Sequence, residues 1–121
     1  MAKDITIVCF GDSITAAKNQ MPDESKRWPN ILQKKLSDVS SDFIFTVINS
    51  GVGGNSDREK MARFEMDVLS HNPDFVLLEF GGNNNDPNKP DRRVSLDEMR
   101  ELLTKYITNI PKKTKTIVVT F

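Results

Sequence analysis

The sequence predicts an α/β protein in which helices cover both faces of a doubly wound parallel sheet. Two observations predict this fold class: four short apolar runs recur along the chain, and segments with helical spacing separate them. The predicted element order is therefore βαβαβαβ, which is typical of βαβ units with right-handed crossovers. We expect residues 1–121 to form one three-layer α/β/α domain of flavodoxin-like shape. The expected strand order is 2-1-3-4, with a fifth strand missing.

The four predicted strands are largely unbroken apolar runs rich in Val, Ile and Phe, as expected of strands buried on both faces. They cover residues 5–10 (ITIVCF), 43–48 (FIFTVI), 75–80 (FVLLEF) and 116–121 (TIVVTF). The last run ends at Phe121 with no turn or covering helix after it. A parallel strand needs cover on its second face, so we expect a domain cut short at this point.

Two helices are predicted before the third strand. The first covers about residues 28–39, and its first turn tolerates Pro29. The second begins at Ser56, where Glu59 completes the S-x-x-E pattern of a capping box. We expect it to continue as one helix that stops before Pro73. Its inward residues are expected to be Met61, Phe64, Val68 and Leu69.

A third helix is predicted over residues 96–110, between a capping box at Ser95 and the helix-ending Pro111. Apolar residues recur in it at intervals of three and four, which places them on one helix face. They are Leu96, Met99, Leu102, Leu103, Tyr106, Ile107 and Ile110.

The composition is that of a globular protein without a strong charge. Apolar residues make up 37% of the chain and charged residues 28%, and 17 basic residues balance 17 acidic ones. A net charge of zero argues against nucleic acid or an anionic membrane as the partner. No segment approaches the ~20 apolar residues of a membrane helix, and we expect no signal peptide at the start. We expect a cytoplasmic protein, in which the single Cys9 is buried and forms no internal disulfide.

Polar and glycine-rich segments follow the first three predicted strands. They are Gly11-Asp12-Ser13, residues 49–56 (NSGVGGNS) and residues 81–86 (GGNNND). With strand order 2-1-3-4, these loops converge on one crevice at the carboxyl edge of the sheet, where open α/β sheets bind ligands. They bring together a hydroxyl, a glycine-rich backbone and carboxamides. Acyl transfer needs such a set: a nucleophile, and donors for the developing oxyanion.

These segments resemble the motifs of the SGNH, or GDSL, ester hydrolases. The resemblance rests on FGDSIT at 10–15, INSGVGGNS at 48–56 and FGGNNND at 80–86, with RWPNIL at 27–32 as a further match. It implies a three-layer α/β sandwich that cleaves esters or thioesters without metal or cofactor. It also implies that Ser13 is the nucleophile. The oxyanion hole would be the Ser13 N–H, the Gly54 N–H and the Asn83 side chain, with Gly53 as the alternative glycine.

Two departures from the family pattern matter. Asn84 stands where the family usually has Asp, which we expect to change the local structure rather than the chemistry. The family's Asp-x-x-His segment does not occur within these 121 residues. The single histidine, His71, precedes the third strand at the amino edge, and a six-residue strand spans ~20 Å. A base must lie within ~3 Å of the serine hydroxyl, so His71 is not the base.

Other readings of these residues are open to the sequence. Ser13 can be a turn residue, and residues 81–86 can be a flexible loop. Asp12 is expected to orient the turn by accepting hydrogen bonds from backbone N–H groups, and Trp28 is most simply core. A dinucleotide fingerprint would need glycines at 51, 53 and 56, but position 56 is a serine. The acidic side chains lack companion histidines, so no metal site is predicted.

The function predicted from the sequence is a serine ester hydrolase acting on a small-molecule ester. The chain alone is expected to be inactive, because Ser13 has no base. The alternative is a non-catalytic ligand-binding domain of flavodoxin-like shape, such as a lapsed hydrolase. The final predicted strand would present an apolar edge, so self-association is a further expectation.

Overall fold

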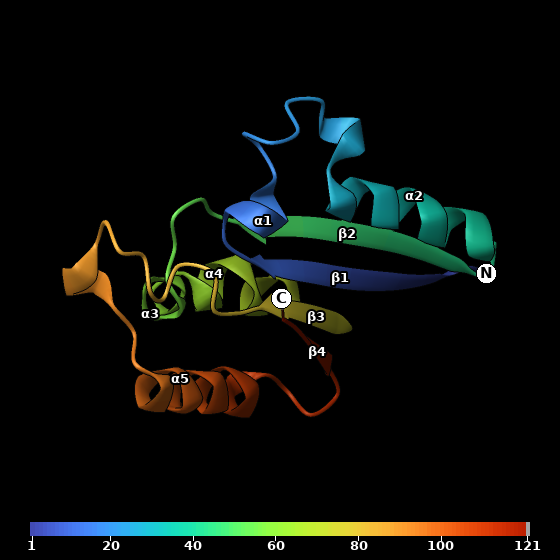
Figure 1. The fold of residues 1–121 in the computed structure, drawn as a ribbon. Coiled ribbons are helices and arrows are strands. Elements are labelled where there is room, and N and C mark those ends of the chain that lie inside the picture. The colour runs from blue at the N-terminus through green and yellow to red at the C-terminus, as the bar shows by residue number, and fades with distance from the viewer. Residues whose placement is uncertain (121) are drawn as a thin grey trace.

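The computed structural model describes residues 1–120 and confirms the predicted fold class (Figure 1). Its strands are β1 (Lys3–Gly11), β2 (Phe43–Gly51), β3 (Phe75–Glu79) and β4 (Lys115–Val119). All pairs are parallel and the order is β2-β1-β3-β4, as predicted. The last predicted strand included Phe121, which lies outside the described residues.

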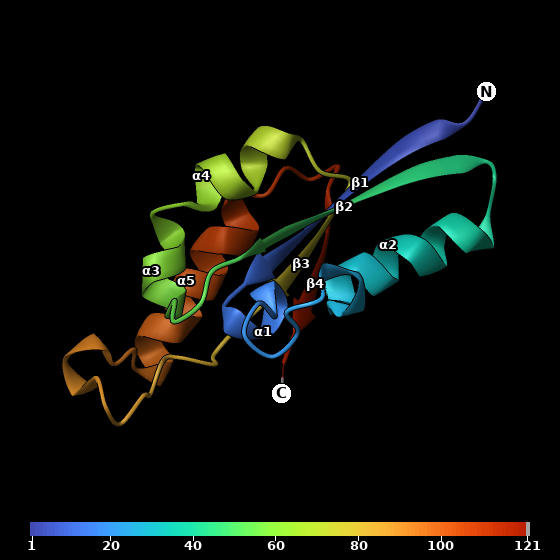
Figure 2. The same ribbon diagram turned by 90° about the horizontal axis from the view of Figure 1, so that it is seen from above.

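Helices on both faces of the sheet make three layers (Figure 2). Helix α2 (Trp28–Val39) lies on one face, with the bounds predicted from the sequence. The other face carries α3 (Asp57–Met61), α4 (Phe64–Asp67) and α5 (Leu96–Asn109). The remaining helical segments are short: α1 (Ser13–Ala16), η1 (Glu24–Lys26), η2 (Leu69–His71) and η3 (Pro90–Arg92). The described helices include none that is both long and apolar enough to cross a bilayer.

The second predicted helix is interrupted, so the expectation of one helix up to Pro73 is wrong. Ser56 caps its start with the predicted capping box, but α3 ends at Met61 and the chain leaves the helical region at Arg63 (φ −112°, ψ 5°). The Arg63 guanidinium donates hydrogen bonds to the backbone oxygens of Gly11 and Ser50, both 2.7 Å away. We infer that these tertiary contacts outweigh the helical bonds lost at this point.

The main core lies between the sheet and helices α3, α4 and α5. Tyr106 of α5 is fully buried and packs edge-on against three phenylalanine rings, with centroid distances of 4.8 to 5.8 Å. Those rings belong to Phe10, Phe64 and Phe80. Because Phe10 and Phe80 flank the carboxyl ends of β1 and β3, this cluster fixes the positions from which the first and third loops leave the sheet.

The predicted apolar face of α5 is only partly buried. Leu102, Tyr106 and Ile110 lie in the core, but Leu96 is 82% exposed and Ile107 is 46% exposed. Helix α5 begins beyond the carboxyl ends of the strands, so Leu96 has no sheet to pack against (Figure 1). Ile107 lies about 100° around the helix from Tyr106 and turns away from the core.

On the opposite face, helix α2 packs against β2. Cys9 is fully buried there, as predicted, and burial raises the pKa of its thiol to about 12. Beyond α2 the same face opens into an apolar groove of about 230 Å³. Ile117 of β4 lines this groove and is 50% exposed. Covering helices therefore leave part of each sheet face open, since Val118 of β4, on the face of the main core, is also 39% exposed.

Candidate active site

The carboxyl ends of β1 and β2 lie in register, with Gly11 opposite Gly51. Directly beyond them, the Val52 N–H donates to the Gly11 oxygen at 3.1 Å, so the first two loops leave the sheet in contact. A Cβ on Gly51 would lie 2.2 Å from the backbone nitrogen of Ala16. Only a glycine therefore lets α1 pack this closely on the end of β2.

Ser13 is the first residue of α1, and its side chain is partly exposed at the end of β1. The preceding Asp12 caps this helical turn, because its Oδ1 accepts a hydrogen bond from the Ile14 N–H at 2.9 Å. The backbone bond predicted for Asp12 is thus present. Ala17 closes the turn in the left-handed conformation (φ 55°), and its N–H donates to the Ser13 oxygen at 2.7 Å.

Of the two candidate glycines, Gly53 is the one that faces Ser13. A Cβ on Gly53 would lie 3.9 Å from the Ser13 Cβ, which is ordinary contact distance. Gly54 has φ of +79°, and its oxygen accepts a hydrogen bond from Arg92 Nη2 at 3.1 Å. A cleft of about 110 Å³ opens beside Ser13. It is lined by Ser13, Ala16, Lys18, Asn19, Gln20 and Gly53.

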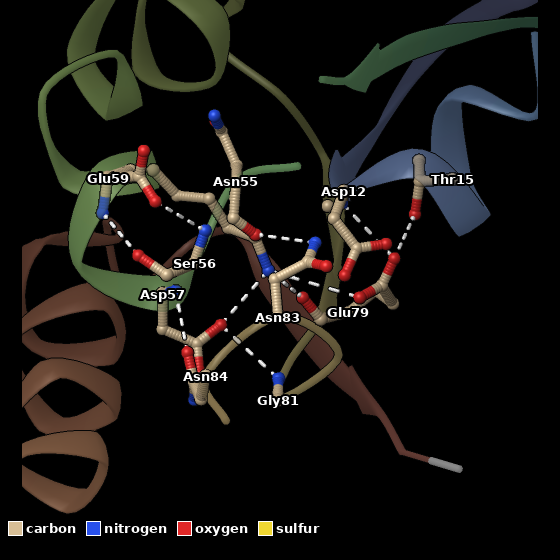
Figure 3. A network of polar contacts seen from close by, with 12 residues as sticks. Asp12, Thr15, Asn55, Ser56, Asp57, Glu59, Glu79, Gly81, Asn83 and Asn84 are labelled. Atoms are coloured by element: carbon tan, nitrogen blue, oxygen red, sulfur yellow. Dashed lines mark hydrogen bonds and ion pairs between the residues drawn. The ribbon is translucent and has the colours of Figure 1, made fainter. Parts of the chain in front are cut away.

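Two asparagines of the third loop, Asn83 and Asn84, make different contacts (Figure 3). Asn83 is half-buried, and its Nδ2 donates to the backbone oxygen of Asn55 at 3.1 Å. This bond ties the third loop (residues 81–86) to the second loop (residues 49–56), called the glycine loop below. Asn84 is buried and exchanges two hydrogen bonds with Asp57, one of them from the Asp57 N–H at 2.9 Å. Asn84 therefore anchors the start of α3 instead of lining the Ser13 cleft.

A buried polar cluster beneath the loops was missed from the sequence. Glu79 at the end of β3 is 3% exposed, and its Oε1 accepts hydrogen bonds from the Asp12 N–H (3.2 Å) and Thr15 Oγ1 (3.1 Å). Lys60 is fully buried, and its Nζ donates to Asp57 Oδ1 at 3.0 Å and to the backbone oxygen of Glu79 at 2.7 Å. The available signal was a single acid within the apolar run FVLLEF.

The Glu79 carboxyl group resists ionisation in this setting. Desolvation by burial is the largest cause, followed by the nearness of the Asp12 carboxyl group, which favours a protonated Glu79 that can donate to it, and by the charge of Asp12. Together they raise the pKa of Glu79 to about 7, against the opposing effect of the Lys60 ammonium.

Arg63 is a second site residue that periodicity did not reveal. Besides the oxygens of Gly11 and Ser50, its guanidinium donates to Asn55 Oδ1 at 2.7 Å. It also lies over the Phe10 ring, 4.6 Å from the ring centroid. One side chain thus connects the end of β1, the end of β2 and the glycine loop.

His71 and Trp28 lie outside the Ser13 cleft. His71 is exposed in η2, just before the amino end of β3, whereas Ser13 follows the carboxyl end of β1. The prediction that Trp28 is core is wrong: it is half-buried, and its Nε1 donates to the Ile14 oxygen at 3.1 Å. Together with Ile14 and Met21 it lines a second cleft, of about 290 Å³.

A family model and several curated proteins match this chain. The model described as GDSL-like Lipase/Acylhydrolase matches residues 7–121. An arylesterase of Vibrio mimicus is 38% identical over 77 residues, which cover 64% of this chain and 36% of that protein. Esterase TesA of Pseudomonas aeruginosa is 35% identical over 78 residues, covering 64% of this chain and 37% of its own length. The matches thus cover little more than a third of these relatives.

A solved structure with the same fold comes from Geobacillus stearothermophilus. It is a catalytic mutant of an acetylxylan esterase, with a TM-score of 0.81 and 25% sequence identity. The superposition covers 98% of this chain and 60% of the esterase chain. Nearly the whole of the present fold therefore recurs there, within a longer protein.

Proposed function

The chain belongs to the GDSL-like lipase/acylhydrolase family, and we propose that it supplies the nucleophile and oxyanion donors of a serine ester hydrolase. One observation carries this proposal: Ser13 opens a capped helical turn beside a cleft that Gly53 of the second loop also lines. A hydroxyl in that position can attack the acyl carbon of a small-molecule ester bound in the cleft.

Three donors are proposed for the oxyanion: the Ser13 N–H, the Gly54 N–H and the Asn83 side chain. Asn83 is supported by its chemistry, because a carboxamide has two N–H groups and Asn55 occupies one of them. The shared lining of one cleft by Gly53 and Ser13 supports Gly53 as the alternative glycine donor. A glycine N–H can approach a substrate oxygen closely because no Cβ stands in the way.

A base for the Ser13 proton is the part of the mechanism that these residues do not supply. The single histidine is exposed at the opposite edge of the sheet. We propose that residues 1–121 form a single domain that lacks the Asp-x-x-His segment and hydrolyses esters little faster than buffer does. Loss of a triad histidine elsewhere costs about 10⁶ in kcat.

The test uses p-nitrophenyl acetate with and without added imidazole, which serves as a diffusible base. We expect slow hydrolysis by the chain alone, a larger rate with imidazole, and an acetyl group on Ser13 by mass spectrometry. Ser13→Ala should remove the imidazole-dependent excess over a protein-free blank, whereas Ser41→Ala, an exposed position, should keep it. An excess that survives Ser13→Ala would contradict the nucleophile assignment.

A second candidate is a non-catalytic ligand-binding domain of the same fold, which would need no base at Ser13. This candidate predicts that a small ester binds beside Ser13 and shifts its NMR signals. Imidazole would then produce no hydrolysis above the protein-free blank and no acetylation of Ser13. The two candidates therefore differ in the mass of Ser13 after incubation, not in binding.

Partner class and location complete the proposal. We propose a small-molecule ester as the partner, without nucleic acid or membrane, and a cytoplasmic location. Fractionation of cells that express the natural protein tests the location. Co-purification of nucleic acid, read from the ratio of absorbance at 260 and 280 nm, tests the partner class.

A further inference from the structure

Two acidic side chains lie together beneath the turn that carries Ser13. Asp12 is 1% exposed and Glu79 is 3% exposed, so neither carboxyl group reaches water. Figure 3 shows the two groups side by side, pointing toward one another between the ends of β1 and β3. Two carboxylates in such a place cannot both be charged without a large electrostatic cost.

The hydrogen bonds of the pair account for only half of its oxygens. Glu79 Oε1 accepts from the Asp12 N–H and from Thr15 Oγ1, and Asp12 Oδ1 accepts from the Ile14 N–H. Asp12 Oδ2 and Glu79 Oε2 have no hydrogen-bond partner and are the two buried side-chain atoms of residues 1–120 in that position. Buried polar atoms are almost always paired, and a proton between the two groups would pair both oxygens.

The surrounding charges do not neutralise both carboxylates. From α3, Lys60 Nζ lies 3.9 Å from Glu79 Oε2, but it is closer to Asp57 Oδ1, at 3.0 Å. The Arg63 guanidinium is engaged by backbone oxygens and by Asp67. On the β4 side, the register places the apolar Val119 opposite Glu79. Three buried carboxyl groups therefore face one buried ammonium.

From α5, Tyr106 adds no charge to this cluster. Its hydroxyl donates to the backbone oxygen of Asp57 at 2.8 Å. Burial raises the pKa of Tyr106, so the hydroxyl stays neutral. The charge imbalance beneath the loops is thus not relieved from any element that packs there.

We propose that Asp12 and Glu79 share one proton, carried by Glu79 and donated to Asp12, and that this pair positions Ser13. The shared proton stands on the burial and pairing of these two groups alone. The positioning role rests on the proposed function of Ser13.

The pair controls the turn because it holds the backbone on both sides of Ser13. The Asp12 carboxylate holds the Ile14 N–H, while Glu79 holds the Asp12 N–H and the Thr15 hydroxyl. Gly11 permits this arrangement: a Cβ there would lie 2.3 Å from Thr15 Oγ1 and 2.7 Å from Glu79 Oε1. When Glu79 ionises, repulsion between the carboxylates acts directly on these bonds.

The elevated pKa of Glu79, about 7, puts this change close to neutral pH. Between the ordinary value of 4.5 and about 7, the folded protein keeps a proton that the unfolded chain has lost. The stabilisation from the shared proton is therefore fully present below pH 4.5. It is lost as the pH rises to about 7.

The experiment follows the intact chain by NMR from pH 4 to 9, with ¹³C detection of the glutamate carboxyl carbons. We expect the Glu79 carboxyl to titrate near pH 7, and the Ser13 and Ile14 amide signals to move with the same midpoint. Glu79→Gln offers Asp12 an amide donor that does not titrate, so it should remove the amide transition. Glu101→Gln on the exposed side of α5 should leave it unchanged.

A second variant keeps the test decisive if Glu79→Gln does not fold. Asp12→Asn removes the neighbouring charge, so the Glu79 midpoint should fall toward its ordinary value. The proposal is overturned if Glu79 of the unaltered chain titrates near pH 4.5, or if Asp12→Asn leaves the midpoint of the Glu79 titration unchanged. It is also overturned if the amide transition persists in Glu79→Gln. None of these NMR measurements requires ester hydrolysis. Their outcome therefore tests the shared proton separately from the proposed function.

Discussion

The Asn83 carboxamide combines a structural contact with the proposed catalytic one. One N–H holds the Asn55 oxygen, which orients the amide plane, and the other N–H remains for a substrate oxygen. The neighbouring Asn84 uses its side-chain Oδ1 and Nδ2 in hydrogen bonds with Asp57, and Asn85 is exposed. Three consecutive asparagines thus have three different surroundings, and we propose only the first, Asn83, as an oxyanion donor.

We therefore expect Asn83→Ala to lower the Ser13-dependent, imidazole-stimulated hydrolysis rate by about 10²–10³-fold, as loss of one oxyanion donor does elsewhere. Asn85→Ala is the matched control and should keep the rate. Circular dichroism should show the same fold in both variants. An unchanged rate in folded Asn83→Ala would move the donor role to another group.

Glu59 links the capping of α3 to the loop that follows β3. Its carboxylate accepts hydrogen bonds from the Ser56 N–H and from Arg92. The hydrogen bond from Arg92 is the main reason that the pKa of Glu59 falls to about 2. This depressed pKa means that the ionised group stabilises the fold above pH 4.5, and that the stabilisation disappears as the pH falls toward 2.

Glu59→Gln should consequently lower the urea midpoint at pH 7, and the gap to the unaltered chain should narrow as the pH is lowered from 5 to 3. The control is Glu65→Gln on the exposed side of α4, which should show a small and constant gap. A Glu59→Gln gap that does not depend on pH would mean that the charge of Glu59 contributes nothing.

Helix α1 depends on its close packing against the end of β2. A Cβ at Gly51 would meet the Ala16 nitrogen at 2.2 Å and the Ala16 Cα at 2.8 Å, and these are backbone atoms that cannot rotate aside. Gly53 lies two residues later, and the nearest atom to a Cβ at that position would be the Ser13 Cβ, at 3.9 Å. The two positions differ in space, not in residue type.

Gly51→Ala should destabilise the fold by about 1–3 kcal/mol, the usual cost of overpacking, and lower the melting temperature by several degrees. Gly53→Ala should leave the melting temperature nearly unchanged. Differential scanning calorimetry on both variants checks this, and equal melting temperatures would show that α1 moves away at little cost.

The sheet and its order could be predicted because strands and helices leave local patterns in the sequence. The residues of α2 and α5 follow this rule, and so does the Asp12 cap. The break at Arg63 does not, because its cause is a set of acceptors on β1, β2 and the glycine loop. The buried position of Glu79 could not be predicted for the same reason. Its partner Asp12 lies 67 residues away, and a single acid in a strand does not reveal a buried pair.

At the scale of the whole molecule, the edge strand β4 exposes apolar side chains. Within residues 1–120 the sheet ends at β4, which pairs with β3 alone, and two side chains on opposite faces of β4 remain open. Ile117 is 50% exposed and Val118 is 39% exposed. An edge strand with apolar side chains invites pairing with another chain.

We expect the chain to self-associate reversibly, with a sedimentation coefficient that rises with concentration. Ile117→Lys should weaken this association at least tenfold, because burying an isoleucine contributes about 1.5–3 kcal/mol. Leu96→Lys is the control, since Leu96 is 82% exposed on α5, and it should not change the sedimentation. A monomer at all concentrations would contradict the expectation.

The Arg63 side chain has a consequence for how the site opens. Because one guanidinium holds the ends of β1 and β2 together with Asn55, these segments cannot separate one at a time without leaving its N–H groups unpaired. Their amides should therefore exchange with deuterium as a single cooperative unit. Replacing the five-donor fork with the smaller ammonium of lysine would split that unit, and the glycine loop would then exchange faster than the strand ends that it now opens with.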